Sequence, residues 1–354
     1  MLELVEGNLL EAQADALVNT VNTEGVMGKG IALQFSKKFP EMMEAYRRAC
    51  KAGEVQPGRM QVYESQEMFS PRYIINFPTK RHWRTPSRLE DIEAGLSALV
   101  SEIRARGIRS IAVPPLGCGN GGLDWGDVLP LIKAKLGGLS DVKVLVYPPQ
   151  GAPSAGEIVH RTERPEMNPS RAIVIKIWQQ YFALGYQLTL LEVHKLLYFL
   201  QEAGEPLRLR FAKETYGPYA DNLRHVLHRF EGHFTLGFAD GRNKPDTEIV
   251  LQPGAVEEAD QFITSHAESS RPSLERLARV AQLVEGFESP YGMELLATVH
   301  WVAVHDRARS LEETVAGVHA WNARKKKLMA REHVTVAYNR LAAHGWIGPT
   351  ETDV

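Results

Sequence analysis

Short apolar runs alternate with longer amphipathic stretches over the first 150 residues of the chain. Two of the longer stretches, residues 28–53 and 87–107, carry apolar residues at helical spacing, and we expect Ser87 to cap the second and Gly107 to follow its last turn. This alternation predicts one α/β domain over residues 1–150 with a largely covered sheet. The runs that predict its strands are Leu2–Glu6, Ala16–Thr20, Met60–Glu64, Tyr73–Phe77, Ser110–Val113 and Val142–Tyr147.

The pattern changes after residue 150. Residues 151–169 are rich in Pro, Gly, Ser and charged side chains, which is typical of a linker. From residue 170 to 354 apolar residues recur three and four positions apart, which predicts a mainly α-helical domain with a small hairpin within residues 233–252. The three lysines at Lys325–Lys327 are interpreted as a solvent-exposed helix face.

Composition narrows the possible functions. The chain has 41 Lys and Arg against 43 Asp and Glu, a net charge of −2, so any contact with a polyanion must be local. Cys50 and Cys118 are too few for a disulfide framework or a four-cysteine zinc site, and we expect no metal or cofactor. Without a signal peptide or a long apolar run, the sequence predicts a cytoplasmic protein with no membrane partner.

Two glycine-rich segments each follow a predicted strand and precede a predicted helix. They are NTVNTEGVMGKGIALQF at residues 19–35 and IAVPPLGCGNGGLDWGDV at residues 111–128. Glycine lets the backbone approach a ligand closely, and the N-terminus of the following helix attracts an anion. Neither segment has the spacing of a P-loop or of a dinucleotide fingerprint. Turn and capping glycines are the plain alternative for either loop alone, but the pair favours a diphosphate held between both loops.

These segments, with GNLL at residues 7–10, resemble the macrodomain, an α/β/α module that binds ADP-ribose. The resemblance implies that Asn22 binds the distal ribose, although a turn amide bonded to its own backbone is the alternative for this residue. It also implies that Asn8 and Leu9 lie near the adenine and that Tyr147 or Pro148 flanks the base. Many macrodomains have an aspartate at the position of Asn8. The loop residues that would hold the diphosphate are Gly28, Lys29, Gly30, Ile31, Ala32, Gly117, Cys118, Gly119, Asn120, Gly121, Gly122 and Leu123.

The segment NFPTKRHWRTPSR, residues 76–88, contains the candidate for catalysis. It is similar to the terminal ADP-ribose glycohydrolase branch of macrodomains and, more closely, to the DarG antitoxins, which remove ADP-ribose from thymidine in single-stranded DNA. The resemblance implies that Lys80 is catalytic together with Asn22. Asp124 does not clearly match the aspartate of the protein-directed branch, so covalent and electrostatic roles of Lys80 both stay open.

The residues after Lys80 combine cations with aromatic rings, a pattern typical of single-stranded nucleic-acid contacts. A solvated loop is the alternative. The residues that predict the DNA contact are Arg81, His82, Trp83 and Arg84.

The second domain contains KLLYF at residues 195–199 and YGP at residues 216–218, which resembles the Panacea-type antitoxin modules. The resemblance implies that this domain binds and blocks the cognate DarT toxin, a DNA ADP-ribosyltransferase. Two rival interpretations are a non-catalytic ADP-ribose reader and a hydrolase of ADP-ribosylated protein.

Overall fold

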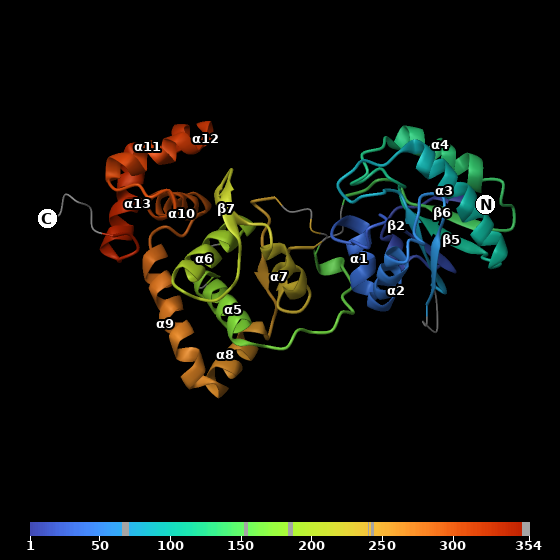
Figure 1. Cartoon of the computed structure of the whole chain (residues 1–354). Helices are drawn as coiled ribbons and strands as arrows, with labels where there is room; N and C mark the ends of the chain where they lie inside the picture. The colour runs from blue at the N-terminus through green and yellow to red at the C-terminus, as the bar shows by residue number, and fades with distance from the viewer. Residues whose placement is uncertain (66–70, 152–154, 183–186, 240, 242–243, 349–354) are drawn as a thin grey trace. The chain divides into compact units, whose positions relative to one another are not determined.

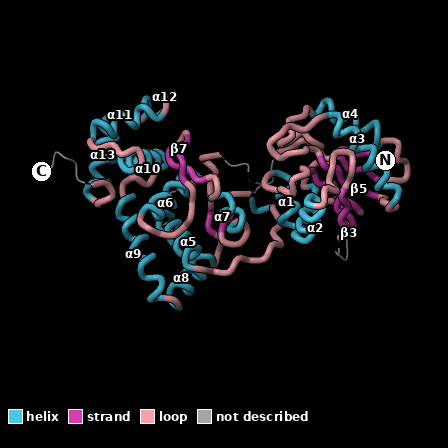
Figure 2. Tube along the Cα trace, in the orientation of Figure 1, coloured by secondary structure: helices cyan, strands magenta, loops and turns pink. Residues whose placement is uncertain are grey.

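The structure, a computed structural model, describes residues 1–65, 71–151, 155–182, 187–239, 241 and 244–348. The chain folds as two compact units (Figure 1). The first comprises Met1–Glu163 with Ala239–Arg242, and the second comprises Arg164–Phe238 with Asn243–Val354. The larger sheet belongs to the first unit, and helices dominate the second (Figure 2).

A six-stranded sheet in the order β1-β6-β5-β2-β4-β3 forms the middle layer of the first unit. Its neighbours pair in parallel except β3, which is antiparallel to β4. The predicted strands are confirmed, with some ends shifted by a residue or two. The strands are β1 (Leu2–Leu4), β2 (Ala16–Val21), β3 (Gln61–Glu64), β4 (Tyr73–Pro78), β5 (Ser110–Val113) and β6 (Lys143–Val146).

Helices cover both faces of this sheet because successive strand residues point to opposite faces. Leu17 of β2 packs in one core with α1 (Gly30–Lys38) and α2 (Pro40–Lys51). Its neighbour Val18 packs in a second core with α3 (Leu89–Ala105) and α4 (Trp125–Leu136). These helices and β2 are labelled in Figure 1. The predicted three-layer α/β/α fold with a mixed sheet is confirmed.

Two local expectations need correction. The stretch over residues 28–53 divides at Phe39, because Pro40 lacks an N–H group and begins α2 at its first position. The expectation that Ser87 caps α3 is wrong, since Arg88 occupies the cap position. Ser87 instead donates its backbone N–H to the Gly121 carbonyl at 2.9 Å, so a tertiary contact sets its position. Gly107 follows the last turn of α3 with a φ of 63°, as predicted.

One hydrophobic core organises the second unit. Trp178 of α5 (Pro169–Phe182), Phe199 of α6 (Leu190–Glu202) and Leu296 of α10 (Pro290–Val304) are fully buried in it. The mainly helical fold is confirmed, and so is the small hairpin, formed by β9 (Thr235–Leu236) and β10 (Val250–Leu251). The other elements are β7 (Phe211–Glu214), β8 (Gly217–Ala220), α7 (Leu223–Phe230), α8 (Ala255–Ser265), α9 (Ala267–Val284), α11 (Leu311–Trp321), α12 (Ala323–Leu328) and α13 (Arg331–Ala343).

The lysine run on α12 is not a uniformly solvated face. The side chain of Lys325 is 0% exposed, and its ammonium donates to Glu294 Oε1 at 2.7 Å and to Thr298 Oγ1 at 3.0 Å. A buried cation requires such partners, because leaving water is costly for a charge. Lys326 and Lys327 are exposed, as expected.

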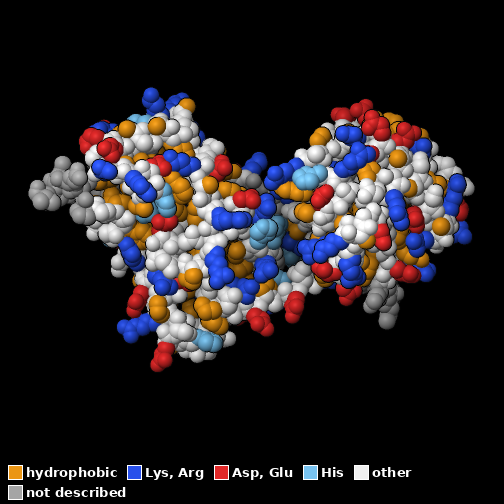
Figure 3. All heavy atoms as spheres, in the orientation of Figure 1, with side chains coloured by type: hydrophobic (Ala, Val, Ile, Leu, Met, Phe, Trp, Pro, Cys, Tyr) orange, Lys and Arg blue, Asp and Glu red, His pale blue; other side chains and the backbone are white. Residues whose placement is uncertain are grey.

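Charges of both signs are interspersed on the face drawn in Figure 3, which agrees with the net charge near zero. Among the residues that the structure describes, no helix combines the length and the apolar character needed to cross a bilayer.

Candidate active site

The strand order brings the predicted site residues to one edge of the sheet. Every strand except β3 runs in the same direction, so the connections that follow these strands start at the same edge. The connections after β1, β6, β5, β2 and β4 contain, in that spatial order, Asn8, Tyr147, the second glycine loop, the first glycine loop and Lys80.

The first glycine loop is organised around Asn22, whose side chain is largely buried. Its Oδ1 accepts from the N–H of Glu24 at 2.9 Å, and its Nδ2 donates to the carbonyl of Val26 at 2.5 Å. Tyr46 of α2 donates its hydroxyl to the Asn22 carbonyl at 2.6 Å, and burial raises the pKa of Tyr46, so this phenol stays protonated as a donor. The amide therefore bonds within its own loop, and its bond to ribose stays a prediction.

The start of α1 follows this loop. Gly28 is half-buried, Lys29 is the exposed N-cap residue, and its side chain makes no capping bond. Gly30 begins the helix with a φ of 63°. The N–H groups of a first helical turn have no partner within the helix, so this turn, with Ile31 and Ala32, suits an anion.

The second glycine loop closes on itself through a bond from the N–H of Leu123 to the carbonyl of Gly117 at 3.1 Å. Gly121 has no room for a side chain, since a Cβ atom there would lie 2.1 Å from the Gly117 oxygen. Cys118 is half-buried, and Gly119, Asn120 and Gly122 are exposed. Asp124 caps α4 by accepting from the N–H of Gly126 at 2.6 Å, so its carboxylate has a structural use.

Lys80 lies two residues after β4 and is half-buried. Its ammonium donates to the backbone carbonyl of Asn120 in the second glycine loop. Burial lowers the pKa of Lys80 below its ordinary value of 10.5. A lysine in this setting can act as a nucleophile or base when neutral, and as an electrostatic stabiliser when charged.

The residues after Lys80 separate into two kinds. The guanidinium of Arg81 binds Asp91 of α3 at 2.9 Å, so it is engaged by the protein. The rings of His82 and Trp83 stack with centroids 5.4 Å apart, and the guanidinium carbon of Arg84 lies 4.4 Å from the Trp83 centroid. Trp83 is 40% exposed, so a surface stack of rings and a cation is available to a base.

The residues predicted near adenine lie at the other end of the sheet edge. Asn8 accepts from the N–H of Leu10 at 3.0 Å and caps a short 3₁₀ helix, Leu9–Glu11, in which Leu9 is buried. Tyr147 follows β6, is buried, and donates its N–H to the Val113 carbonyl at 2.9 Å. Burial raises the pKa of its phenol.

Sequence reasoning missed three residues that shape the site: Tyr46, Thr23 and Ser87. Tyr46 supports Asn22 from α2, and Thr23 donates its hydroxyl to the carbonyl of Arg81. Ser87 packs against the second loop near Gly117 and Gly121. Their roles depend on contacts between segments far apart in the chain, so no local pattern indicates them.

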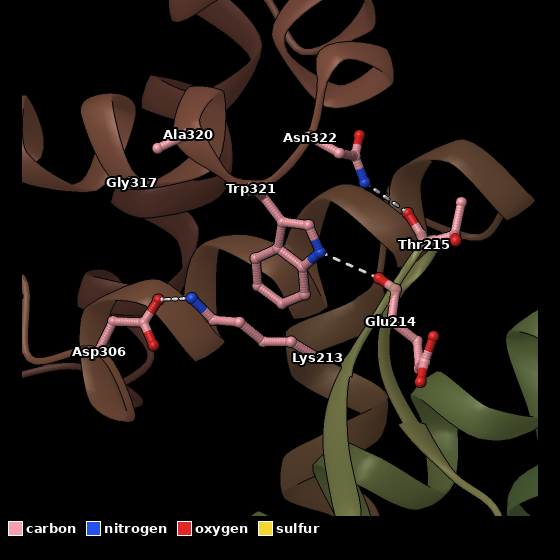
Figure 4. Close-up of a pocket in the computed structure, with 8 residues that line it drawn as sticks. All are labelled: Lys213, Glu214, Thr215, Asp306, Gly317, Ala320, Trp321 and Asn322. Carbon is pink, nitrogen blue, oxygen red and sulfur yellow. Dashed lines mark hydrogen bonds and ion pairs between the residues drawn. The ribbon is translucent and has the colours of Figure 1, made fainter.

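Within the described residues, no group of three or more His, Cys, Asp or Glu side chains is arranged to hold a metal ion. A hollow of about 520 Å³ lies in the second unit (Figure 4). Trp321 donates its Nε1–H to the Glu214 carbonyl at 2.9 Å there, and Lys213 pairs with Asp306. Its lining residues, Lys213, Glu214, Thr215, Asp306, Gly317, Ala320, Trp321 and Asn322, include none of those predicted to bind ADP-ribose.

Several known proteins are similar to this chain, some over part of its length and some over nearly all of it. The family model described as Macro domain matches residues 18–132. A DNA ADP-ribosyl glycohydrolase of Thermus aquaticus is 48% identical over 351 residues, which cover 99% of this chain and 96% of the relative. A DNA ADP-ribosyl transferase-DNA ADP-ribosyl glycohydrolase fusion protein of Thermosipho africanus is 36% identical over 163 residues, 42% of each chain. The solved macrodomain of Mycobacterium tuberculosis DarG is 54% identical, with a TM-score of 0.42, and the match covers 42% of this chain and 99% of that one.

Proposed function

The chain belongs to the DNA ADP-ribosyl glycohydrolase family, and on this basis we propose that it hydrolyses the bond between ADP-ribose and thymidine in single-stranded DNA. In this role it is the antitoxin that reverses DNA ADP-ribosylation, and it acts in the cytoplasm. Residues 1–150 carry the hydrolase, residues 151–169 are the linker, and residues 170–354 bind and block the cognate DarT toxin. The observation that carries the proposal is the half-buried Lys80 bonded to the second glycine loop.

The order of connections along the sheet edge supports this function. Asn8 and Tyr147 follow the edge strand β1 and its neighbour β6, the glycine loops follow β5 and β2, and Lys80 follows β4. An ADP-ribose laid along this edge has its adenine at β1 and β6, its diphosphate at the loops and its distal ribose at β4. The bond to the DNA base is at the distal ribose, so this orientation puts the reacting carbon beside Lys80.

The proposed roles follow from this orientation. The N–H groups of the glycine loops and of the first turn of α1 hold the diphosphate. Among the described residues, the Nδ2 of Asn22 makes one hydrogen bond, to Val26, so its second N–H remains for a ribose hydroxyl. Lys80 acts at the anomeric carbon or stabilises charge as the glycosidic bond breaks. Trp83 and Arg84 hold the DNA strand.

The toxin-binding role of the second unit is proposed from its resemblance to the Panacea-type modules, and two observations accompany it. The Thermosipho africanus relative is named as a fusion of a transferase with a glycohydrolase, so the two activities are joined in that protein. In this chain the two motifs of the second unit contact each other, since the buried Lys195 of KLLYF donates to the carbonyl of Pro218 in YGP at 2.6 Å. The motifs therefore form one structural unit at α6 and β8.

The deciding experiment compares release of ADP-ribose from an ADP-ribosylated thymidine oligonucleotide with release from glutamate-modified protein. We expect turnover of the DNA substrate, its loss in Lys80→Ala, and normal turnover in Lys133→Ala, which removes an exposed lysine from α4. Lys80→Ala should still bind free ADP-ribose and still copurify with the transferase. Full activity in Lys80→Ala, or preference for modified protein, would contradict the proposal.

A further inference from the structure

The pairing of β2 with β4 continues past the end of both strands. Val21, the last residue of β2, is in register with Pro78, the last residue of β4. One residue further, the N–H of Thr79 donates to the Val21 carbonyl at 2.9 Å. Thr79 itself is buried, so the backbone directly before Lys80 is fixed to the end of β2.

A side chain makes the next link between the two connections. The hydroxyl of Thr23 donates to the backbone carbonyl of Arg81. Asn22 therefore lies between two cross-linked positions on one connection, and Lys80 lies between two cross-linked positions on the other. The residues proposed for catalysis are thus held opposite one another by bonds made by their neighbours in the sequence.

We infer that Thr23 is a positioning residue, whose hydroxyl holds Lys80 opposite Asn22 through the backbone of Arg81. This inference rests on the proposed function of Lys80. Thr23 does not itself perform chemistry in this arrangement. It holds the Arg81 carbonyl, in the second peptide group after Lys80, while the Asn120 carbonyl accepts from the ammonium at the other end of the Lys80 side chain.

The Arg81–Asp91 ion pair cannot replace this link. The Arg81 side chain is 56% exposed, and its ion pair with Asp91 anchors the guanidinium and not the main chain. A long guanidinium side chain also leaves its own backbone several rotatable bonds away from the anchor. The Thr23 bond ends on the main chain of Arg81, the residue next to Lys80, so it restrains the Lys80 backbone through one intervening residue.

Thr23→Val in the full chain removes the hydroxyl and keeps the branched shape. We expect kcat for the ADP-ribosylated oligonucleotide to fall roughly ten- to a hundredfold, since small misplacements of a catalytic group have effects of this size. KM and the Kd for free ADP-ribose should stay within about twofold, because the loops that hold the diphosphate are unchanged. Thr23→Ser keeps the hydroxyl and should restore most of kcat.

A second measurement does not depend on turnover. Competitive acylation of the lysine amines, followed by mass spectrometry over a range of pH, reports the titration of Lys80 itself. In the wild type its midpoint should lie below that of an exposed lysine. In Thr23→Val, Lys80 moves toward water and its midpoint should rise. The matched control is Thr85→Val. In the wild type the Thr85 hydroxyl donates to the His82 carbonyl at 2.9 Å within the same turn. The Lys80 midpoint in Thr85→Val should stay as in the wild type.

The inference is overturned if the Lys80 midpoint is the same in Thr23→Val and wild type, or if Thr85→Val changes it equally. It is also overturned if Thr23→Val changes only KM, which would make Thr23 a substrate contact, or if Thr23→Ser fails to restore kcat. A wild-type chain that releases no ADP-ribose would contradict the proposed function, and the acylation measurement would still decide the role of Thr23.

Discussion

The ammonium of Lys80 donates a hydrogen bond to the backbone carbonyl of Asn120. Lys80 follows β4 and Asn120 follows β5, and these strands are separated in the sheet by β2. The bond therefore links two connections on either side of the one that carries Asn22. It joins the proposed catalytic amine to the second glycine loop, which is proposed to hold the diphosphate.

The pH dependence of turnover distinguishes the two roles of Lys80. Burial lowers the pKa of its ammonium below 10.5, so the neutral amine is populated at lower pH than in an exposed lysine. If the amine is the nucleophile or base, kcat rises with pH through this pKa; if the charged form stabilises the transition state, kcat falls through it. Lys80→Arg, which stays charged, should retain activity only in the second case.

Trapping with borohydride is an independent test of whether Lys80 forms a covalent bond to the ribose or only stabilises charge. In a covalent route the neutral Lys80 amine displaces the DNA base at the anomeric carbon, the base leaves with a proton, and the ribosylamine ring opens to an imine. Borohydride reduces this imine, so reduction should attach mass to the peptide that contains Lys80. An unlabelled peptide with full turnover would contradict the covalent route.

Gly121→Ala should weaken binding of ADP-ribose. A Cβ atom at this position would lie 2.1 Å from the Gly117 carbonyl and 2.3 Å from the Ser87 hydroxyl, so the loop must change its shape. We expect the Kd for ADP-ribose, measured by calorimetry, to rise at least tenfold, about 1.4 kcal/mol. Gly138→Ala is the control, because a Cβ atom there meets nothing within 4 Å. Unchanged binding in Gly121→Ala would show that the second loop does not hold the ligand.

Trp83→Ala and Arg84→Ala should weaken binding of the modified oligonucleotide and leave binding of free ADP-ribose unchanged. Stacking of a base on an aromatic ring contributes about 1–3 kcal/mol, so KM should rise roughly tenfold in Trp83→Ala. Loss of one phosphate contact in Arg84→Ala should reduce the salt dependence of binding by about one counterion. Arg104→Ala, an exposed cation on α3, is the control. If Arg84→Ala and Arg104→Ala bind the oligonucleotide with the same affinity and salt dependence, residues 81–84 form a solvated loop that does not contact DNA.

Lys325→Met should destabilise the second unit by about 3 kcal/mol. The change removes a buried partner of Glu294, and a buried carboxylate that loses a partner is costly even though Arg324 still binds it at 2.5 Å. Chemical denaturation of the full chain, followed by a probe in the second unit, measures the effect.

Lys326→Met, on the exposed side of α12, is the matched control and should change the free energy of unfolding by less than about 0.5 kcal/mol. The double variant Lys325→Met with Glu294→Leu should recover much of the loss. Equal effects of Lys325→Met and Lys326→Met would mean that the buried pair does not contribute to stability.

The strands of the first unit were predictable because each is an apolar run bounded by turn residues, as at Ser110–Val113. The break at Phe39 was signalled by Pro40, which is favoured at the first position of a helix. Ser87 was not predictable as a loop contact, since a serine before an acidic helix start favours a cap locally. The burial of Lys325 depends on Glu294 on another helix, and no local pattern contains that contact.

The candidate site was only partly readable from the sequence. Glycine spacing indicated the two loops. In a parallel sheet the loops that follow the strands start at the same edge, so the two loops are expected to lie close together. The sequence left two possibilities for the Asn22 amide, and the structure places its bonds within its own loop. Arg81 looked like its neighbour Arg84 in the sequence, yet only Arg81 has Asp91 of α3 beside it.

The pairing of β1 with β6 has a consequence for synthesis of the chain. Leu2–Leu4 is synthesised before the other five strands of this sheet, but its partner Lys143–Val146 is synthesised after all of them. The sheet therefore cannot be completed until β6 has been translated. Until then β1 has no strand to pair with. Contacts so distant in sequence form slowly, so the nascent chain stays open to chaperones or to misassembly until this pair has formed.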